Sequence, residues 1–146
     1  MKLTFLEAAG GVRLSKIVNV TSHEEEIERG DLSQFERALH YHSERGHCLL
    51  KGPLRAPIQN ESRKGCTDNI AYADYIVIDA DNVVLPAYKI RKGMQQSDVQ
   101  LAAEQIVAML PKPFRDVSYI AQASSSLGLK GDRVSLHIYF MLATPL

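Results

Sequence analysis

One stretch limits the possible folds of this chain more than any other, the segment YIVIDADN at residues 75–82. Its first four side chains are apolar and mostly β-branched, which is typical of a buried strand. Side chains alternate between the faces of a strand, so Asp79 and Asp81 share one face. Two neighbouring carboxylates repel each other, and a bound divalent cation removes that cost. The pattern fits a metal site at the C-terminal end of a central strand, and it also fits a strand that ends in an Asp81-Asn82 turn.

A second polar pattern lies near the end of the chain, in the segment VSLHIYF at residues 134–140. Alternation places Ser135, His137 and Tyr139 on one face of the predicted strand and the apolar side chains on the other. Polar residues in this position also occur on a one-sided sheet that faces solvent. Together with the two aspartates they favour a site, because two strands of one sheet can bring carboxylates and an imidazole into one cleft.

Composition excludes several classes of protein. A chain of 146 residues with 45% hydrophobic and 23% charged residues is typical of one soluble globular domain. The 17 basic and 17 acidic side chains cancel, so nucleic-acid binding would need a local basic patch. Cys48 and Cys66 have neither metal-site spacing nor the density of a disulfide scaffold. Without a signal peptide or an apolar run of membrane-span length, the predicted location is the cytoplasm, with no membrane partner.

The first 70 residues predict a small αβ layer. Strands are expected at residues 3–8 and 12–20, on either side of a Gly10-Gly11 turn. A short acidic helical turn at 24–28 follows, then a helix that begins at Asp31 or Ser33 and ends at Gly46. After a short strand at 47–50, a polar loop over residues 51–69 carries four basic side chains, Lys51, Arg55, Arg63 and Lys64.

Residues 71–146 predict a strand at 75–80, a helix at 96–110 capped by Ser97, and strands at 118–123 and 134–142. The strand–helix–strand crossover makes the first two strands parallel neighbours or leaves room for a third strand between them. The last strand then pairs antiparallel with its neighbour. We therefore expect an α+β fold with an RRM-like or ferredoxin-like sheet, in a single domain over residues 1–146 that is truncated at its C-terminus.

The order of these motifs resembles the archaeo-eukaryotic primase superfamily, which includes the primase–polymerases of plasmids, phages and integrated elements. The matching residues are Asp79-Ala80-Asp81 and Ser135-Leu136-His137. The segment at 60–65 and the serine-rich loop at 124–128 are compatible with the same family. The resemblance covers about the second half of the chain, and its specificity comes from the order and setting of two short motifs.

The resemblance implies a DNA primase activity, in which a nucleotidyltransferase makes primers for DNA replication. Asp79 and Asp81 would hold one or two Mg²⁺ or Mn²⁺ ions that bridge the nucleotide phosphates and activate the 3′-hydroxyl. His137 and Ser135 would hold the triphosphate, with further phosphate contacts from Lys130 and Arg133. The implied partners are nucleoside triphosphates, a single-stranded DNA template that the basic loop would contact, and a helicase or further replication domains.

One feature departs from the family pattern. The family carries a third acidic residue on a strand after the Ser-x-His motif, whereas no Asp or Glu follows His137 here. Asp116 and Asp132 both precede that motif, so neither stands in the expected order. The residues present therefore predict a nucleotidyltransferase site that lacks one metal ligand.

Other functions fit parts of the pattern. A haloacid-dehalogenase-like phosphohydrolase also places Asp-x-Asp after an apolar strand, and Val83 suits it, but its motif usually opens the domain and Ser135 and His137 stay unexplained. A sugar-nucleotide transferase accounts for the two aspartates alone. A non-catalytic RRM-like module would bind nucleic acid by stacking bases on Tyr139 and Tyr119, although the aromatic-rich strand of such modules is missing. An inactive, accessory form of the primase fold lies between these alternatives.

Overall fold

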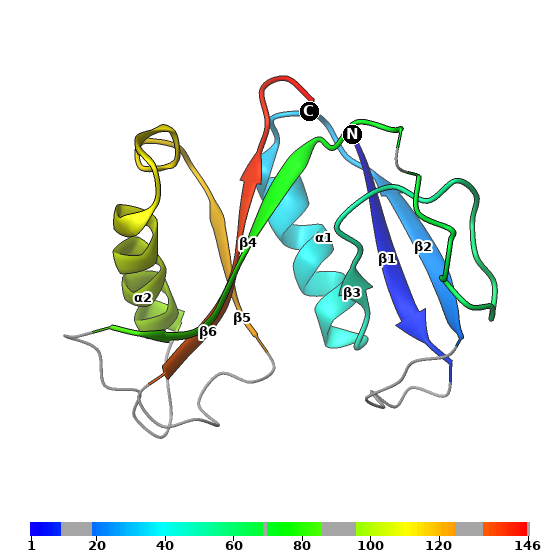
Figure 1. Ribbon diagram of the computed structural model, residues 1–146, viewed down its shortest axis with the longest axis horizontal. Coiled ribbons are helices and arrows are strands. Elements are labelled where there is room, and N and C mark those ends of the chain that lie inside the picture. Colours follow the sequence, from blue (N-terminus) through cyan, green and yellow to red (C-terminus); the bar gives the residue numbers. More distant parts are fainter. Residues whose placement is uncertain (10–18, 69, 86–95, 125–132, 146) are drawn as a thin grey trace. The chain divides into compact units, whose positions relative to one another are not determined.

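The computed structural model describes residues 1–9, 19–68, 70–85, 96–124 and 133–145. The chain divides into two compact units, Met1–Tyr75 with Met141–Leu146 (unit 1) and Ile76–Phe140 (unit 2). Each unit contains one α-helix and strands of one three-stranded sheet (Figure 1), which confirms the predicted α+β class. Within the described residues, neither helix combines the length and the apolar character that crossing a membrane requires.

The sheet of unit 1 has the strand order β2-β1-β3 and antiparallel pairing throughout. Its strands are β1 (Lys2–Ala8), β2 (Val20–Glu26) and β3 (Cys48–Leu49). The central strand β1 pairs along both edges, and side chains also pack on both of its faces. Phe5 stacks on His42 of the helix on one face, and Leu6 packs with Ile58 on the other.

The predicted acidic helical turn at residues 24–28 is wrong, because residues 20–26 form β2. All seven residues of β2 pair with β1, from Ala8↔Val20 to Lys2↔Glu26. The acidic side chains that suggested a helix start have partners outside β2 instead, including a 2.8 Å ion pair between Glu24 and Lys2. The predicted strand at 12–20 falls almost entirely on residues 10–18, which lie outside the described part of the chain.

Helix α1 (Leu32–Glu44) begins and ends where the sequence predicts. Asp31 is its N-cap and accepts a 2.9 Å hydrogen bond from the Gln34 backbone N–H. Its buried residues recur every three or four positions and face the β1 side of the sheet: Phe35, Ala38, Leu39 and His42.

The C-terminus of α1 is a Schellman motif built on Gly46. Gly46 has φ +74°, and its N–H donates to the Ser43 carbonyl at 3.0 Å. The next N–H, of His47, donates to the His42 carbonyl at 3.0 Å. The left-handed glycine therefore turns the chain so that His47 returns beside the last turn of the helix.

The polar loop after β3 packs against unit 1 at defined points. The Val20 N–H donates to the Glu61 carbonyl at 2.8 Å, and the Ser22 N–H donates to the Ile58 carbonyl at 2.9 Å. Ile58 is buried against Leu6. An isolated bridge between Leu54 and Thr67 closes the loop on itself.

In unit 2 the sheet has the order β4-β6-β5, so the last strand lies between the other two. The elements are β4 (Tyr75–Val84), α2 (Gln96–Met109), a 3₁₀ turn (Lys112–Phe114), β5 (Ile120–Ala123) and β6 (Arg133–Met141). This order confirms one of the two predicted alternatives, in which a third strand fills the space left by the crossover. Two expectations are wrong: β6, not the strand at 75–80, is central in the described sheet, and α2 begins at Gln96, before the Ser97 expected to cap it.

Helix α2 covers one face of this sheet, and alternation along β6 decides which residues meet it. Val134, Leu136 and Ile138 are completely buried, and they pack with Ala102 and Ala103 of the helix. Ala80 of β4 belongs to the same core. The side chains between these positions consequently point to the opposite face of the sheet.

We expect Gly46→Ala to lower the free energy of unfolding by about 1–2 kcal/mol, because an L-residue pays this cost in the left-handed region. No atom lies within 4 Å of the position of an added Cβ, so the cost comes from the backbone alone. Urea unfolding measures it. Gly52→Ala is the matched control, since Gly52 has no positive φ and its Cβ would make only an ordinary 3.9 Å contact with Thr67. Equal stability of the two variants would contradict this account of the helix end.

Candidate functional site

The face of the β4-β6-β5 sheet opposite α2 carries the two predicted motifs side by side. We call Asp79, Asp81, Ser135 and His137 the polar sheet face. The Ser135 hydroxyl donates a 2.7 Å hydrogen bond to Asp81 Oδ1, across a sequence separation of 54 residues. His137 Nε2 lies 3.5 Å from Asp79 Oδ1. The structure thus joins each residue of one motif to a residue of the other.

Asn82 of β4 also contacts Asp81 and Ser135. It was not among the predicted site residues. Its backbone N–H donates to Ser135 Oγ at 3.2 Å, and its side-chain amide donates to Asp81 Oδ2 at 2.8 Å. Its φ is +57°, a left-handed conformation that Asn tolerates better than most residues. Both oxygens of Asp81 are therefore oriented by neighbours, and β4 continues to Val84 instead of ending in a turn at Asp81-Asn82.

On the polar sheet face, the carboxylates are exposed to solvent and the serine is buried. Asp79 and Asp81 are exposed and His137 is partly exposed, whereas Ser135 is only 3% exposed. A carboxylate oxygen has two lone pairs, so the hydrogen bonds to Asp81 leave acceptor capacity for a cation. The hydrogen bond from Ser135 therefore orients Asp81, while the oxygens of Asp79 and Asp81 remain accessible from solvent.

The other predicted site residues fall at the start of β6, in unit 1 or outside the described residues. Arg133 is exposed at the first position of β6, and Lys130 falls outside the described residues. The four basic side chains of the polar loop are all exposed and belong to unit 1: Lys51, Arg55, Arg63 and Lys64.

The two tyrosines considered for base stacking are both engaged within the protein. Tyr139 is buried, and its hydroxyl donates to Gln122 Oε1 at 2.9 Å. Tyr119 is partly buried with its ring centroid 5.9 Å from that of Phe140. Burial raises the pKa of the Tyr119 hydroxyl, and Glu104 adds to the effect. The buried ring of Tyr139 therefore offers no open face to a nucleic-acid base.

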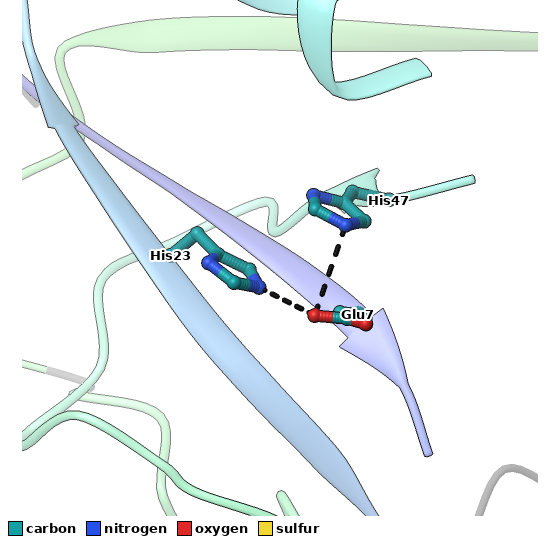
Figure 2. Close-up of side chains that lie close together, drawn as sticks. All are labelled: Glu7, His23 and His47. Carbon is teal, nitrogen blue, oxygen red and sulfur yellow. Dashed lines mark hydrogen bonds and ion pairs between the residues drawn. The ribbon is translucent and has the colours of Figure 1, made fainter. Parts of the chain in front are cut away.

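A second cluster lies in unit 1, where Glu7, His23 and His47 converge (Figure 2). We call these three residues the histidine cluster. One ligand atom from each lies within 4.8 Å of the other two, and no other group of three His, Cys, Asp or Glu in the described chain meets this limit. Glu7 Oε2 is 2.8 Å from His23 Nε2 and 3.8 Å from His47 Nε2.

Strand register explains why these three residues meet. His23 pairs with Phe5 across β1 and β2, and Glu7 lies two residues beyond Phe5 on the same face. The β1–β3 register pairs Phe5 with Leu49, and its continuation by two residues places His47 opposite Glu7.

Next to the histidine cluster, His42 of α1 contacts Phe5, His47 and Glu25. It is 4% exposed and stacks on Phe5 with the ring centroids 3.7 Å apart. Its Nδ1 lies 2.8 Å from His47 Nδ1, and its Nε2 lies 3.1 Å from Glu25 Oε1. Burial is the main cause that lowers the pKa of both His42 and His47, against the opposing effects of Glu25 and Glu7.

Sequence reasoning did not find the histidine cluster. A signal was present, because four of the five histidines fall between residues 23 and 47. Their spacing matches no metal motif, since the three ligands come from β1, β2 and the turn after α1. They come together only because β1 pairs with both β2 and β3.

The chain matches no protein-family model, no curated protein and no solved structure. Its function therefore has to be argued from its own residues.

We expect Ser135→Ala to lower the free energy of unfolding by about 1 kcal/mol, because Asp81 and the Asn82 N–H each lose a hydrogen-bond partner. Urea unfolding measures the change. Ser43→Ala is the control: Ser43 is exposed on α1, and its hydroxyl bonds only to the local His40 carbonyl at 2.9 Å, so a change within about 0.5 kcal/mol is expected. A Ser135 variant as stable as the Ser43 variant would show that the buried contact contributes nothing.

Proposed function

We propose that the polar sheet face binds a nucleoside triphosphate with Mg²⁺ or Mn²⁺, and that the chain is a nucleotidyltransferase domain of DNA primase–polymerase type. One observation carries this proposal. The Asp-x-Asp and Ser-x-His motifs, which resemble that superfamily in sequence, lie on adjacent strands and are joined by the 2.7 Å bond from Ser135 to Asp81.

The donor set suits the proposed ion. Asp79 and Asp81 offer exposed carboxylate oxygens on one face of β4, and Mg²⁺ and Mn²⁺ prefer oxygen ligands. Asp79 and Asp81 would hold such an ion, which would supply the charge stabilisation that nucleotidyl transfer requires. Asn82 and Ser135 hold Asp81 in position before any ligand arrives, which lowers the cost of ordering the site.

His137 is the proposed phosphate ligand from the protein. Its imidazole is partly exposed beside Asp79, and a protonated ring nitrogen donates a strong hydrogen bond to a phosphate oxygen. Arg133 is exposed on the same strand and would add positive charge near the triphosphate. Ser135 acts in this proposal as a positioning residue for Asp81.

The topology and the basic loop support the same proposal. The order β4-β6-β5 around helix α2 is the order expected for the first three strands of an RRM-like or ferredoxin-like sheet. The chain has no net charge, so contact with single-stranded DNA would depend on the exposed basic side chains of the polar loop and would weaken with salt.

The test is calorimetric titration of the chain with a nucleoside triphosphate, with and without Mn²⁺. We expect binding that depends on Mn²⁺ and that weakens more than about tenfold, or about 1.4 kcal/mol, in the double variant Asp79→Asn/Asp81→Asn. Asp116→Asn removes an exposed carboxylate elsewhere in unit 2 and should bind like the unmodified chain. Circular dichroism checks that all three proteins are folded.

Two results would reject the proposal. One is triphosphate binding that is equal in the double aspartate variant and in Asp116→Asn. The other is metal-dependent binding that is abolished by His23→Gln but not by the aspartate changes, because that would move the site to unit 1. Primer synthesis on single-stranded DNA then tests whether a protein that binds triphosphate at the polar sheet face also transfers nucleotides.

A further inference from the structure

The histidine cluster has the donor atoms of a transition-metal site. Zinc binds imidazole nitrogen and carboxylate oxygen, and three protein ligands leave a fourth position for water. Zinc–ligand bonds of about 2.0–2.2 Å place two ligand atoms of a tetrahedral site about 3.3–3.6 Å apart. The Glu7 oxygen lies 2.8 Å from the His23 nitrogen and 3.8 Å from the His47 nitrogen, which brackets that range.

One contact in the cluster, between His47 and Glu7, is too long for a hydrogen bond. Three contacts run in series from Glu25 to Glu7: 3.1 Å to His42, 2.8 Å from His42 to His47, and 3.8 Å from His47 to Glu7. When both imidazoles are neutral, they supply two N–H groups to these three contacts. The longest contact, between His47 and Glu7, is the one that remains without a hydrogen.

The direction of the hydrogen bonds follows from the same count. In this neutral state Glu25 accepts from the Nε2–H of His42, and His42 Nδ1 then accepts from the Nδ1–H of His47. His47 Nε2 then presents a lone pair toward Glu7 Oε2, and two acceptors face each other. A cation between them satisfies both atoms. A metal-bound histidine is usually oriented in this way, by a hydrogen bond from its other nitrogen.

We propose that Glu7, His23 and His47 bind one divalent transition metal ion of the zinc type, with His42 and Glu25 as positioning residues. This inference does not rest on the proposed function of the polar sheet face, since all five residues belong to unit 1. His23 gives up the Nε2 proton that it now shares with Glu7 and carries its proton on Nδ1 instead. The fourth position is open to water.

Binding requires a small rearrangement of one imidazole ring. The His23 and His47 rings are within 4° of parallel with centroids 4.6 Å apart, so one ring must turn before both lone pairs meet at one ion. The His23 side chain is 37% exposed, whereas that of His47 is 9% exposed. His23 is therefore the ring that turns, and His47 is held by His42 and by the Schellman motif.

The experiment is calorimetric titration of the metal-free chain with Zn²⁺ at about pH 7.5, above the ordinary imidazole pKa of about 6.5. We expect one Zn²⁺ per chain, no comparable response to Mg²⁺, and at least about tenfold weaker zinc binding in His23→Gln and in His47→Gln.

His40→Gln is the matched control, because His40 is exposed on α1 and its side chain pairs only with Glu44 at 3.3 Å. It should bind zinc like the unmodified chain. Urea unfolding shows whether each variant is folded. If His47→Gln does not fold, the His23→Gln variant still tests the proposal, because His23 is partly exposed.

A separate measurement tests whether Glu25 and His42 position His47 for zinc binding. Glu25→Ala removes the acceptor for His42 and should weaken zinc binding by about tenfold, whereas Glu25→Gln keeps a carbonyl acceptor and should restore it. Nitrogen NMR of the zinc-loaded chain should show His47 protonated at Nδ1 and metal-bound at Nε2. Zinc affinity that is equal in His23→Gln and His40→Gln, or an unmodified chain that binds no zinc, would overturn the proposal and leave the cluster as an ion-pair network.

Discussion

The alternation of side chains along β6 is the constraint on which unit 2 depends. Val134, Leu136 and Ile138 are completely buried and form the core with α2. That packing forces Ser135 and His137 to the opposite face, where the carboxylates of β4 also point. A shift of one residue in the strand register would exchange the core and the polar sheet face, so the stability of this unit and the geometry of its site have the same origin.

Unit 1 combines core packing and the histidine cluster in a different way. Its sheet buries Phe5 under α1, and the buried position above Phe5 is His42, a residue with two polar nitrogens. A buried imidazole needs partners for both nitrogens, and His47 and Glu25 supply them. Polar groups of this kind lower stability unless all are satisfied, and no buried side-chain nitrogen or oxygen of the described residues lacks a hydrogen-bond partner.

The sequence predicted those features that depend on local pattern. Helix α1 with its Asp31 cap and Gly46 end, the strand that contains Asp79 and Asp81, and the antiparallel pairing of the last strand all follow from periodicity and capping. The α+β class followed from the order of these elements.

Features that depend on pairing between distant segments were not predictable in this way. The acidic run at 24–26 has the local composition of a helix start, yet β1 pairs with it as a strand. The local sequence pattern is compatible with two topologies and does not show that β6 lies between β4 and β5. The histidine cluster needs the registers of β1–β2 and β1–β3 together, and no spacing within the sequence encodes both.

The most direct test of the central claim is paramagnetic NMR of the isotope-labelled chain with substoichiometric Mn²⁺ and a nucleoside triphosphate. If the two motifs form one site, the amide signals of residues 79–82 and 135–137 will broaden together, and they will do so only when both ligands are present. Broadening absent from these two segments, or confined to residues around Glu7, His23 and His47, would contradict the claim that the polar sheet face binds the metal and the nucleotide.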